Sequence, residues 1–428
     1  MDPSEFKFKT NLEVAGLDVV TELITADLTD RAITDRLITD IFSQLNFLNL
    51  VTNVGTDFGN LEKLVSALLA PLVQKGFIEL KIRHVNRKPF FLISAPDSEA
   101  DRIFSRGKDQ VFINNVLIDA HADVVPYGFF SNGQSIIQVD NENNEYIFGR
   151  GANDMLTQVA VIIVLLFRLY RANIRPPVVT ISTDEELSNP GQSKFYKRIS
   201  VPAAISLEPT GTLRGGVVNE IMQSKTILFK KVKRQGYASA EIQRFLSSYF
   251  KEIPYFARLT INAYFDDGNI YMAFTPGNLS DYKLRDLYGT FAALCRELGI
   301  IEEDSLLYSV KPDNADHYYS QVDPEIKSTI LDAVESSYGE AELIEDDNSL
   351  TTALKGKDKD LYALANSFQC SLGLHLPSKE RNTVIVSFPE RGGRHTDSEH
   401  FKVGEPSELL ESLFNIVKNI KLLELVES

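Results

Sequence analysis

Histidine and acidic residues follow two segments of this chain that have the composition of buried β-strands. His121 and Asp123 come directly after the apolar run from Val116 to Ala120, and the triplet Asp184-Glu185-Glu186 comes after the run from Val178 to Thr183. In a His-x-Asp pair, the alternation of side chains along a strand places both residues on one face, where Asp123 can accept a ring N–H of His121 and fix its tautomer. This pairing suits a metal-binding histidine, although a histidine beside an aspartate is more often structural.

Three other segments carry the same residue types. Asp154 lies in Gly149-Arg150-Gly151-Ala152-Asn153-Asp154-Met155, Glu208 begins Glu208-Pro209-Thr210, and His395 begins His395-Thr396-Asp397-Ser398-Glu399-His400. By itself, Asp154 is also explained as the N-cap of the helix that follows it, and the acidic triplet as a solvated turn. Adjacent carboxylates at the end of a buried strand, however, repel one another unless a cation lies between them. Each motif is ordinary by itself, and the informative feature is their order along the chain.

The elements that must position these residues alternate between helices and buried strands. Apolar residues at helical spacing predict helices over 35–51, 61–75 and 155–170. Extended apolar runs predict strands over 77–82, 90–94, 116–120, 178–183, 203–207 and 383–388. This alternation predicts an α/β fold with a mainly parallel central sheet, in which ligands gather where the strands end.

Residues 210–305 have a different character. They contain predicted strands over 227–232, 259–265 and 270–274 and predicted helices over 240–250 and 279–298. A β-α-β-β-α order suits a small two-layer α+β domain inserted into the first domain. We therefore predict a first domain built from residues 1–209 and 306–428, which ends in an amphipathic helix from Ser407 to about Leu423, and a small inserted domain over 210–305.

Composition excludes several classes of function. The 428 residues carry a formal charge of −15, and no run of Lys or Arg with interleaved aromatic residues offsets it, so nucleic acid is not an expected partner. The longest apolar run, Val159 to Phe167, is far shorter than the roughly 20 residues that span a bilayer. Only two cysteines occur, and the N-terminal residues lack the pattern of a signal peptide. We expect a cytoplasmic protein with no membrane partner.

The five motifs, in their order along the chain, resemble those of the M20 family of metallopeptidases and deacylases, which includes carboxypeptidase G2, acetylornithine deacetylase, succinyl-diaminopimelate desuccinylase and aminoacylase. That family carries His-x-Asp-x-Val-Pro, Gly-Arg-Gly-x-x-Asp-Met, Asp-Glu-Glu, Glu-Pro-Thr and a late histidine ahead of Asp-Glu. All five are present here, and the resemblance extends from about Leu61 to the C-terminus. It implies a zinc-exopeptidase-like catalytic domain with an inserted lid.

The resemblance also implies a role for each matched residue. One zinc ion would be held by His121 and Glu208 and a second by Glu186 and His395, with Asp154 bridging the two. Asp123 would orient His121, and Glu185 would be the general base that takes a proton from the attacking water. Mixed imidazole and carboxylate ligands suit Zn²⁺, for which Co²⁺ or Mn²⁺ can substitute, and paired ions about 3.5–4 Å apart can clamp a bridging water.

Two departures from the family pattern fall in the lid. Family members typically carry a lid histidine that stabilises the oxyanion across the dimer, but the comparable stretch here, Gln235 to Ala240, has none. A lid arginine that grips the substrate carboxylate is also absent, because Ile270 to Phe274 occupies the comparable strand. His317, Arg258 and Asn262 are the candidate substitutes. These departures bear on substrate preference and on activity.

The sequence therefore predicts a metallohydrolase that cleaves an amide bond in a small N-acyl amino acid or short peptide. A di- or tripeptidase of the same family is an alternative, and so is a metal-binding protein that lost catalysis with the lid residues. Retention of Glu185, which ligates no metal in this scheme, favours an enzyme. Because the lid often forms the dimer contact in the family, a homodimer is also expected.

Overall fold

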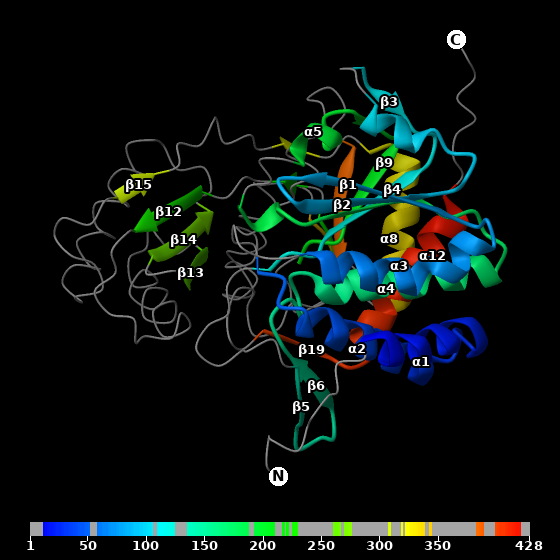
Figure 1. The fold of residues 1–428 in the computed structure, drawn as a ribbon, viewed down its shortest axis with the longest axis horizontal. Helices are drawn as coiled ribbons and strands as arrows, with labels where there is room; N and C mark the ends of the chain where they lie inside the picture. Colours follow the sequence, from blue (N-terminus) through cyan, green and yellow to red (C-terminus); the bar gives the residue numbers. More distant parts are fainter. Residues whose placement is uncertain are drawn as a thin grey trace.

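The computed structural model describes residues 12–51, 58–105, 109–124, 135–187, 192–209, 322–338, 382–388 and 399–420, together with the backbone of eight short strands between residues 216 and 344. An eight-stranded mixed sheet is the centre of this structure (Figure 1). Its strands lie in the order β1 (Glu79–Val85), β2 (Lys88–Ser94), β7 (Val178–Ser182), β4 (Val116–His121), β9 (Ala203–Ser206), β18 (Thr383–Ser387), β10 (Gly216–Val218) and β17 (Glu342–Ile344).

The four middle strands of the sheet, β7, β4, β9 and β18, are parallel to one another. Strands β1, β2 and β10 each pair antiparallel with a neighbour. The predicted α/β class with a mainly parallel central sheet is therefore confirmed. The carboxyl ends of the parallel strands lie along one edge, which is the edge that bears the predicted site.

Alternate residues of the central strands face two different cores. In β4, Ile118 and Ala120 join the larger core with the helices, whereas Leu117 joins a smaller core on the opposite face. This is the two-sided burial that central parallel strands require. The smaller core is completed by η2 (Ala100–Phe104), β3 (Val111–Phe112), α5 (Ser193–Tyr196) and β8 (Ile199–Ser200).

Six longer helices contribute to the larger core. They are α1 (Leu12–Thr25), α2 (Arg31–Phe47), α3 (Gly59–Gln74), α4 (Leu156–Arg171), α8 (Pro324–Tyr338) and α12 (Glu405–Asn419). Helices α3, α4 and α8 contact strands of the sheet, whereas α1 and α2 lie farther from the sheet and pack on the other helices (Figure 1). Helix α4 contacts α1, α2, α3, α12 and strand β4, so it is surrounded, and its residues from Leu156 to Phe167 are all buried. Its apolar composition on every side follows from this position.

Most predicted elements lie within a few residues of those observed. The helix predicted over 35–51 begins earlier, at Arg31, because the side chain of Asp30 accepts the N–H groups of Ala32 and Ile33 as an N-cap. Helix α1, the antiparallel pair β5 (Ile136–Val139) and β6 (Glu145–Phe148), and strand β19 (His400–Lys402), which also pairs with β6, were not predicted.

The strands predicted in the lid are present as β12 (Lys225–Phe229), β13 (Thr260–Asp266) and β14 (Asn269–Thr275), which form a sheet with β15 (Leu307–Ser309) apart from the main sheet (Figure 1). The helices predicted over 240–250 and 279–298 lie outside the described residues. Short strands β11 (Glu220–Ile221) and β16 (Tyr318–Tyr319) pair with each other. Among the described helices, none is both long and apolar enough to cross a lipid bilayer.

Candidate metal centre

Three parallel strands deliver acidic and histidine side chains to one point at the edge of the sheet. His121 is the last residue of β4 and is paired in register with Ser182, the last residue of β7. Glu185 and Glu186 open the single turn η3 (Glu185–Leu187) that follows β7. Glu208 lies two residues beyond the end of β9. Since the strands are parallel and adjacent, residues far apart in the chain meet here.

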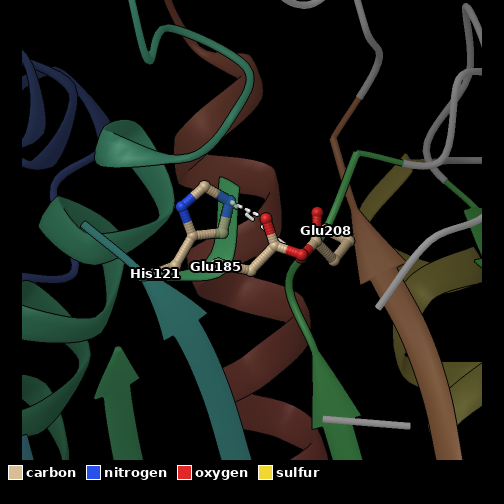
Figure 2. A group of neighbouring side chains, drawn as sticks. All are labelled: His121, Glu185 and Glu208. Carbon is tan, nitrogen blue, oxygen red and sulfur yellow. Dashed lines mark ion pairs between the residues drawn. The ribbon is translucent and has the colours of Figure 1, made fainter. Parts of the chain in front are cut away.

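The imidazole of His121 is the centre of the cluster. Its Nε2 atom lies 2.9 Å from Asp154 Oδ1, 3.9 Å from Glu185 Oε2 and 4.0 Å from Glu208 Oε1. Figure 2 shows the Glu185 and Glu208 carboxylates on the same side of the ring. All four residues are buried.

Two overlapping groups of side chains have the geometry of a metal site. His121, Glu185 and Glu208 form one, and His121, Asp154 and Glu186 form the other, with the ligand atoms of each group within 4.8 Å of one another. The donors are one imidazole nitrogen and several carboxylate oxygens, a set that suits Zn²⁺ and related divalent ions. Four buried or half-buried carboxylates around one ring are costly unless a cation compensates their charge. The residues present therefore fit a metal ion.

The charge around His121 also favours a cation. Burial by itself lowers the pKa of this imidazole, but hydrogen bonds to Asp123 and Asp154, together with the negative charges of Glu208 and Glu185, outweigh burial and raise its pKa well above the ordinary value. The surroundings thus stabilise positive charge at the Nε2 position. A divalent cation at this point would satisfy the same electrostatic demand.

Asp123 holds two parts of the site together. The Nδ1 atom of His121 lies 2.8 Å from the backbone oxygen of Asp123 and 3.5 Å from its carboxylate Oδ1. The Asp123 carboxylate also accepts the backbone N–H groups of Glu185 and Glu186, each at 3.2 Å. The backbone oxygen is the nearer acceptor for His121, and the carboxylate mainly fixes the turn that follows β7.

Asp154 lies on a turn that is anchored by a second buried carboxylate, Glu399. Glu399 Oε1 accepts the backbone N–H groups of Asn153 at 2.7 Å and Asp154 at 3.0 Å, and Glu399 Oε2 lies 3.5 Å from Nη1 of the buried Arg150. Burial raises the pKa of Glu399 to about 7, with Arg150 acting in the opposite direction. The sequence motif contains Glu399 but assigned it no role. Because strand β19, which follows Glu399, was not predicted, no sequence signal separated Glu399 from the other polar residues of this motif.

A buried acid, Asp119, lies two residues before His121 and was not singled out from the sequence. Its Oδ1 atom accepts hydrogen bonds from Thr180 at 2.5 Å and from the Tyr196 hydroxyl at 3.0 Å. Burial raises the pKa of Asp119 to about 7. A charged residue in the middle of an otherwise apolar strand was the available signal.

The other candidate residues and histidines lie either outside the described part of the chain or away from the cluster. His395, His317, Arg258 and the lid stretch Gln235 to Ala240 lie outside the described residues, and only the backbone of Asn262 is described. The other two described histidines contact other partners: His84 is exposed and lies 2.8 Å from Glu62, and His400 stacks on the ring of Phe148 with centroids 4.3 Å apart.

Comparison with known proteins identifies the family. Residues 117–417 match the model of peptidase family M20/M25/M40. No curated protein sequence is significantly similar to the chain. Two solved structures have the same fold at low identity. One is human carnosine dipeptidase 1, with a TM-score of 0.56 and 9% identity, covering 96% of this chain and 99% of that chain. The other is the dipeptidase Dug1p from Saccharomyces cerevisiae, with a TM-score of 0.50 and 10% identity, covering 96% and 99%.

The family match covers well over half of the chain and includes every described residue of the cluster. One imidazole and several carboxylates are ligand types that the metal ions of hydrolases use. The chain belongs to peptidase family M20/M25/M40. It is a metallohydrolase of peptide or amide substrates, as the sequence motifs predicted.

Proposed function

We propose that the protein hydrolyses the amide bond of a small N-acyl amino acid or a short peptide with two zinc ions bound in one site. The observation that carries this proposal is the convergence of His121, Asp154, Glu185, Glu186 and Glu208 in two groups that share His121. Two ions in one site need a ligand that both can share, and the two oxygens of the Asp154 carboxylate can supply it, whereas the one free ring nitrogen of His121 binds a single ion. Co²⁺ and Mn²⁺ are the expected substitutes for Zn²⁺.

In this proposal, His121 and Glu208 hold one ion, Glu186 and His395 hold the other, and Asp154 bridges them. The contact of 2.9 Å between Asp154 Oδ1 and His121 Nε2 supports the assignment of these two side chains to the same ion. Glu185 faces the same point as Glu208, with its Oε2 atom 3.9 Å from His121 Nε2. Distance alone therefore allows Glu185 to act either as a ligand or as the base.

We assign Glu185 as the general base and Glu186 as the ligand. When bound, the ions would lower the pKa of a water molecule towards 7 and polarise the substrate carbonyl. Glu185 then takes the proton of that water and later delivers it to the leaving nitrogen. The Asp123 carboxylate accepts the backbone N–H groups of both glutamates, so it fixes the backbone from which the two side chains extend.

The substrate is a short peptide or an acylated amino acid. The two solved structures with TM-scores of 0.56 and 0.50 are both dipeptidases, which favours the di- or tripeptidase alternative. A metal-binding protein without activity is the remaining alternative from another class of function, and the placement of Glu185 in the cluster supports an enzyme. We further propose that the protein is cytoplasmic, that it forms a homodimer through its lid, and that it has neither nucleic acid nor membrane as a partner.

The test begins with metal analysis of the purified chain, followed by turnover of paired substrates. N-acetyl amino acids and the matching free-amine dipeptides should be assayed side by side with Zn²⁺, Co²⁺ and Mn²⁺. Turnover of the acylated series alone supports a deacylase, and turnover of the free-amine series alone supports a peptidase. Stoichiometric metal binding with no turnover in either series would overturn the proposed activity and leave a metal-binding protein.

A further inference from the structure

Glu399 fixes both ends of the turn that carries Asp154. Its side chain is 1% exposed, and its Oε1 atom accepts the N–H groups of Asn153 and Asp154 at 2.7 and 3.0 Å. Its backbone oxygen accepts the N–H of Gly149 at 3.1 Å. One residue thus holds the beginning and the end of the segment from Gly149 to Asp154.

The backbone of Glu399 is itself anchored. The next residue, His400, begins β19, which pairs with β6 in the register His400 to Phe148. Phe401 is fully buried, and its ring lies 5.5 Å from that of Phe42. Because β6 leads directly into the turn with Asp154, the contacts of Glu399 close a short, well-packed loop between the two segments.

The two carboxylate oxygens of Glu399 have different neighbours. Oε1 accepts the two backbone N–H groups, whereas Oε2 faces Arg150 Nη1 at 3.5 Å. The two N–H groups belong to consecutive residues, so their hydrogen bonds to one buried oxygen fix the backbone orientation of the turn. A buried ion pair, by contrast, adds little net stability. One oxygen of Glu399 therefore holds the backbone of the turn, and the other forms the ion pair with Arg150.

We propose that Glu399 is a positioning residue for the metal site, acting through the backbone of Asn153 and Asp154. This inference rests on the proposed function, in which the Asp154 carboxylate bridges two ions. A bridging carboxylate must present both oxygens at fixed angles, and a small rotation of its backbone turns one of them away. Glu399 prevents that rotation, because it binds the N–H of the ligand residue and of the residue before it.

The competing explanation is that Glu399 only neutralises the buried charge of Arg150. Two substitutions distinguish the effect of the length of the side chain from the effect of its charge. Glu399→Asp keeps the charge but withdraws the carboxylate by one carbon–carbon bond, about 1.5 Å. Glu399→Gln keeps the length and an oxygen that accepts the N–H groups but removes the charge. If Glu399 positions Asp154, metal affinity depends on the length of the side chain at position 399. If it only balances charge, metal affinity depends on charge.

The experiment measures zinc affinity of the full-length, metal-depleted protein by competition with a chromophoric chelator, and thermal stability of the same metal-free samples. We expect Glu399→Asp to weaken zinc binding by about 10- to 100-fold, as the loss of an outer ligand contact does. Glu399→Gln should keep the wild-type zinc affinity while its melting temperature falls. Wild-type affinity in Glu399→Asp, or equal weakening in both variants, would overturn the proposal.

Matched controls come from Glu408, which pairs with Arg31 at 2.6 Å on the surface. Glu408→Asp and Glu408→Gln should leave zinc affinity unchanged.

Asp154→Ala tests the underlying function: if it binds zinc as the wild type does, the proposed metal site fails. If Asp154→Ala loses zinc and Glu399→Asp does not, only the role of Glu399 fails.

Discussion

Two turns that carry predicted metal ligands are held in the same way by carboxylates from different parts of the chain. Asp123 accepts the N–H groups of Glu185 and Glu186, which lie 62 and 63 residues later. Glu399 accepts the N–H groups of Asn153 and Asp154, which lie 246 and 245 residues earlier. Both carboxylates are buried, and both bind two consecutive backbone groups of a turn.

The difference between the two lies in their other contacts. Asp123 also lies against His121, so it connects two ligand-bearing segments directly. Glu399 faces Arg150 instead and connects the Asp154 turn to the segment that follows residue 395. The ligands of this site are therefore oriented by bonds to their backbone, and the loss of either carboxylate should loosen a different subset of ligands.

The largest effect is expected from the residues inside the cluster. Glu185→Gln should lower kcat by about 100- to 10,000-fold, because a general base is lost, while both metal ions remain bound. Asp154→Ala should lose both ions and all activity. Metal content by elemental analysis and steady-state kinetics distinguish the two. Equal loss of metal in both variants would place Glu185 among the ligands.

The next largest effect is expected at Asp123. Asp123→Ala removes the acceptor of the N–H groups of Glu185 and of the proposed ligand Glu186, so zinc affinity should fall by about 100-fold, near the upper end for outer contacts. A chelator competition assay measures this loss. Asp27→Ala is the matched control, because Asp27 accepts the N–H of Thr29 at 2.9 Å in an exposed turn. If the two variants bind zinc equally well, Asp123 does not support the site.

Arg150→Met should affect stability more than metal binding. It leaves the buried carboxylate of Glu399 without its charged partner, which should cost about 3 kcal/mol of unfolding free energy. Urea denaturation of the metal-free protein measures this change. Arg31→Met, which breaks an exposed pair with Glu408, should cost at most about 1 kcal/mol. Zinc affinity reduced as strongly as in Asp123→Ala would show that Arg150 acts on the site itself.

The smallest effect is expected at His400. His400→Ala removes the ring that stacks on Phe148, which should lower stability by about 1 kcal/mol and leave metal content unchanged. His395→Ala, in contrast, should lose metal. Parallel measurement of metal content and melting temperature for the two variants tests which histidine is the ligand, and metal loss in His400→Ala would reverse the assignment.

Much of the fold could be predicted because its signals are local. The run Val178 to Thr183 and the helix from Met155 to Tyr170 are apolar enough to be identified as buried elements, and the structure has β7 and α4 there. Strand β5 could not be predicted from burial, since its Ile136 and Ile137 are 53% and 62% exposed. Its pairing with β6, which also binds the distant β19, is a long-range contact that no local pattern contains.

The sequence by itself determined the family and predicted the types of ligand and their order, because these depend on motifs of a few residues that can be compared one by one. Only the tertiary structure decided that His121, Asp154, Glu185 and Glu208 face one another, and that Asp123 and Glu399 accept backbone N–H groups of the neighbouring turns. Backbone N–H groups are identical in every non-proline residue, so a sequence cannot say which carboxylate binds which of them. That choice is made by the parallel sheet, which brings the ends of separate strands to one edge.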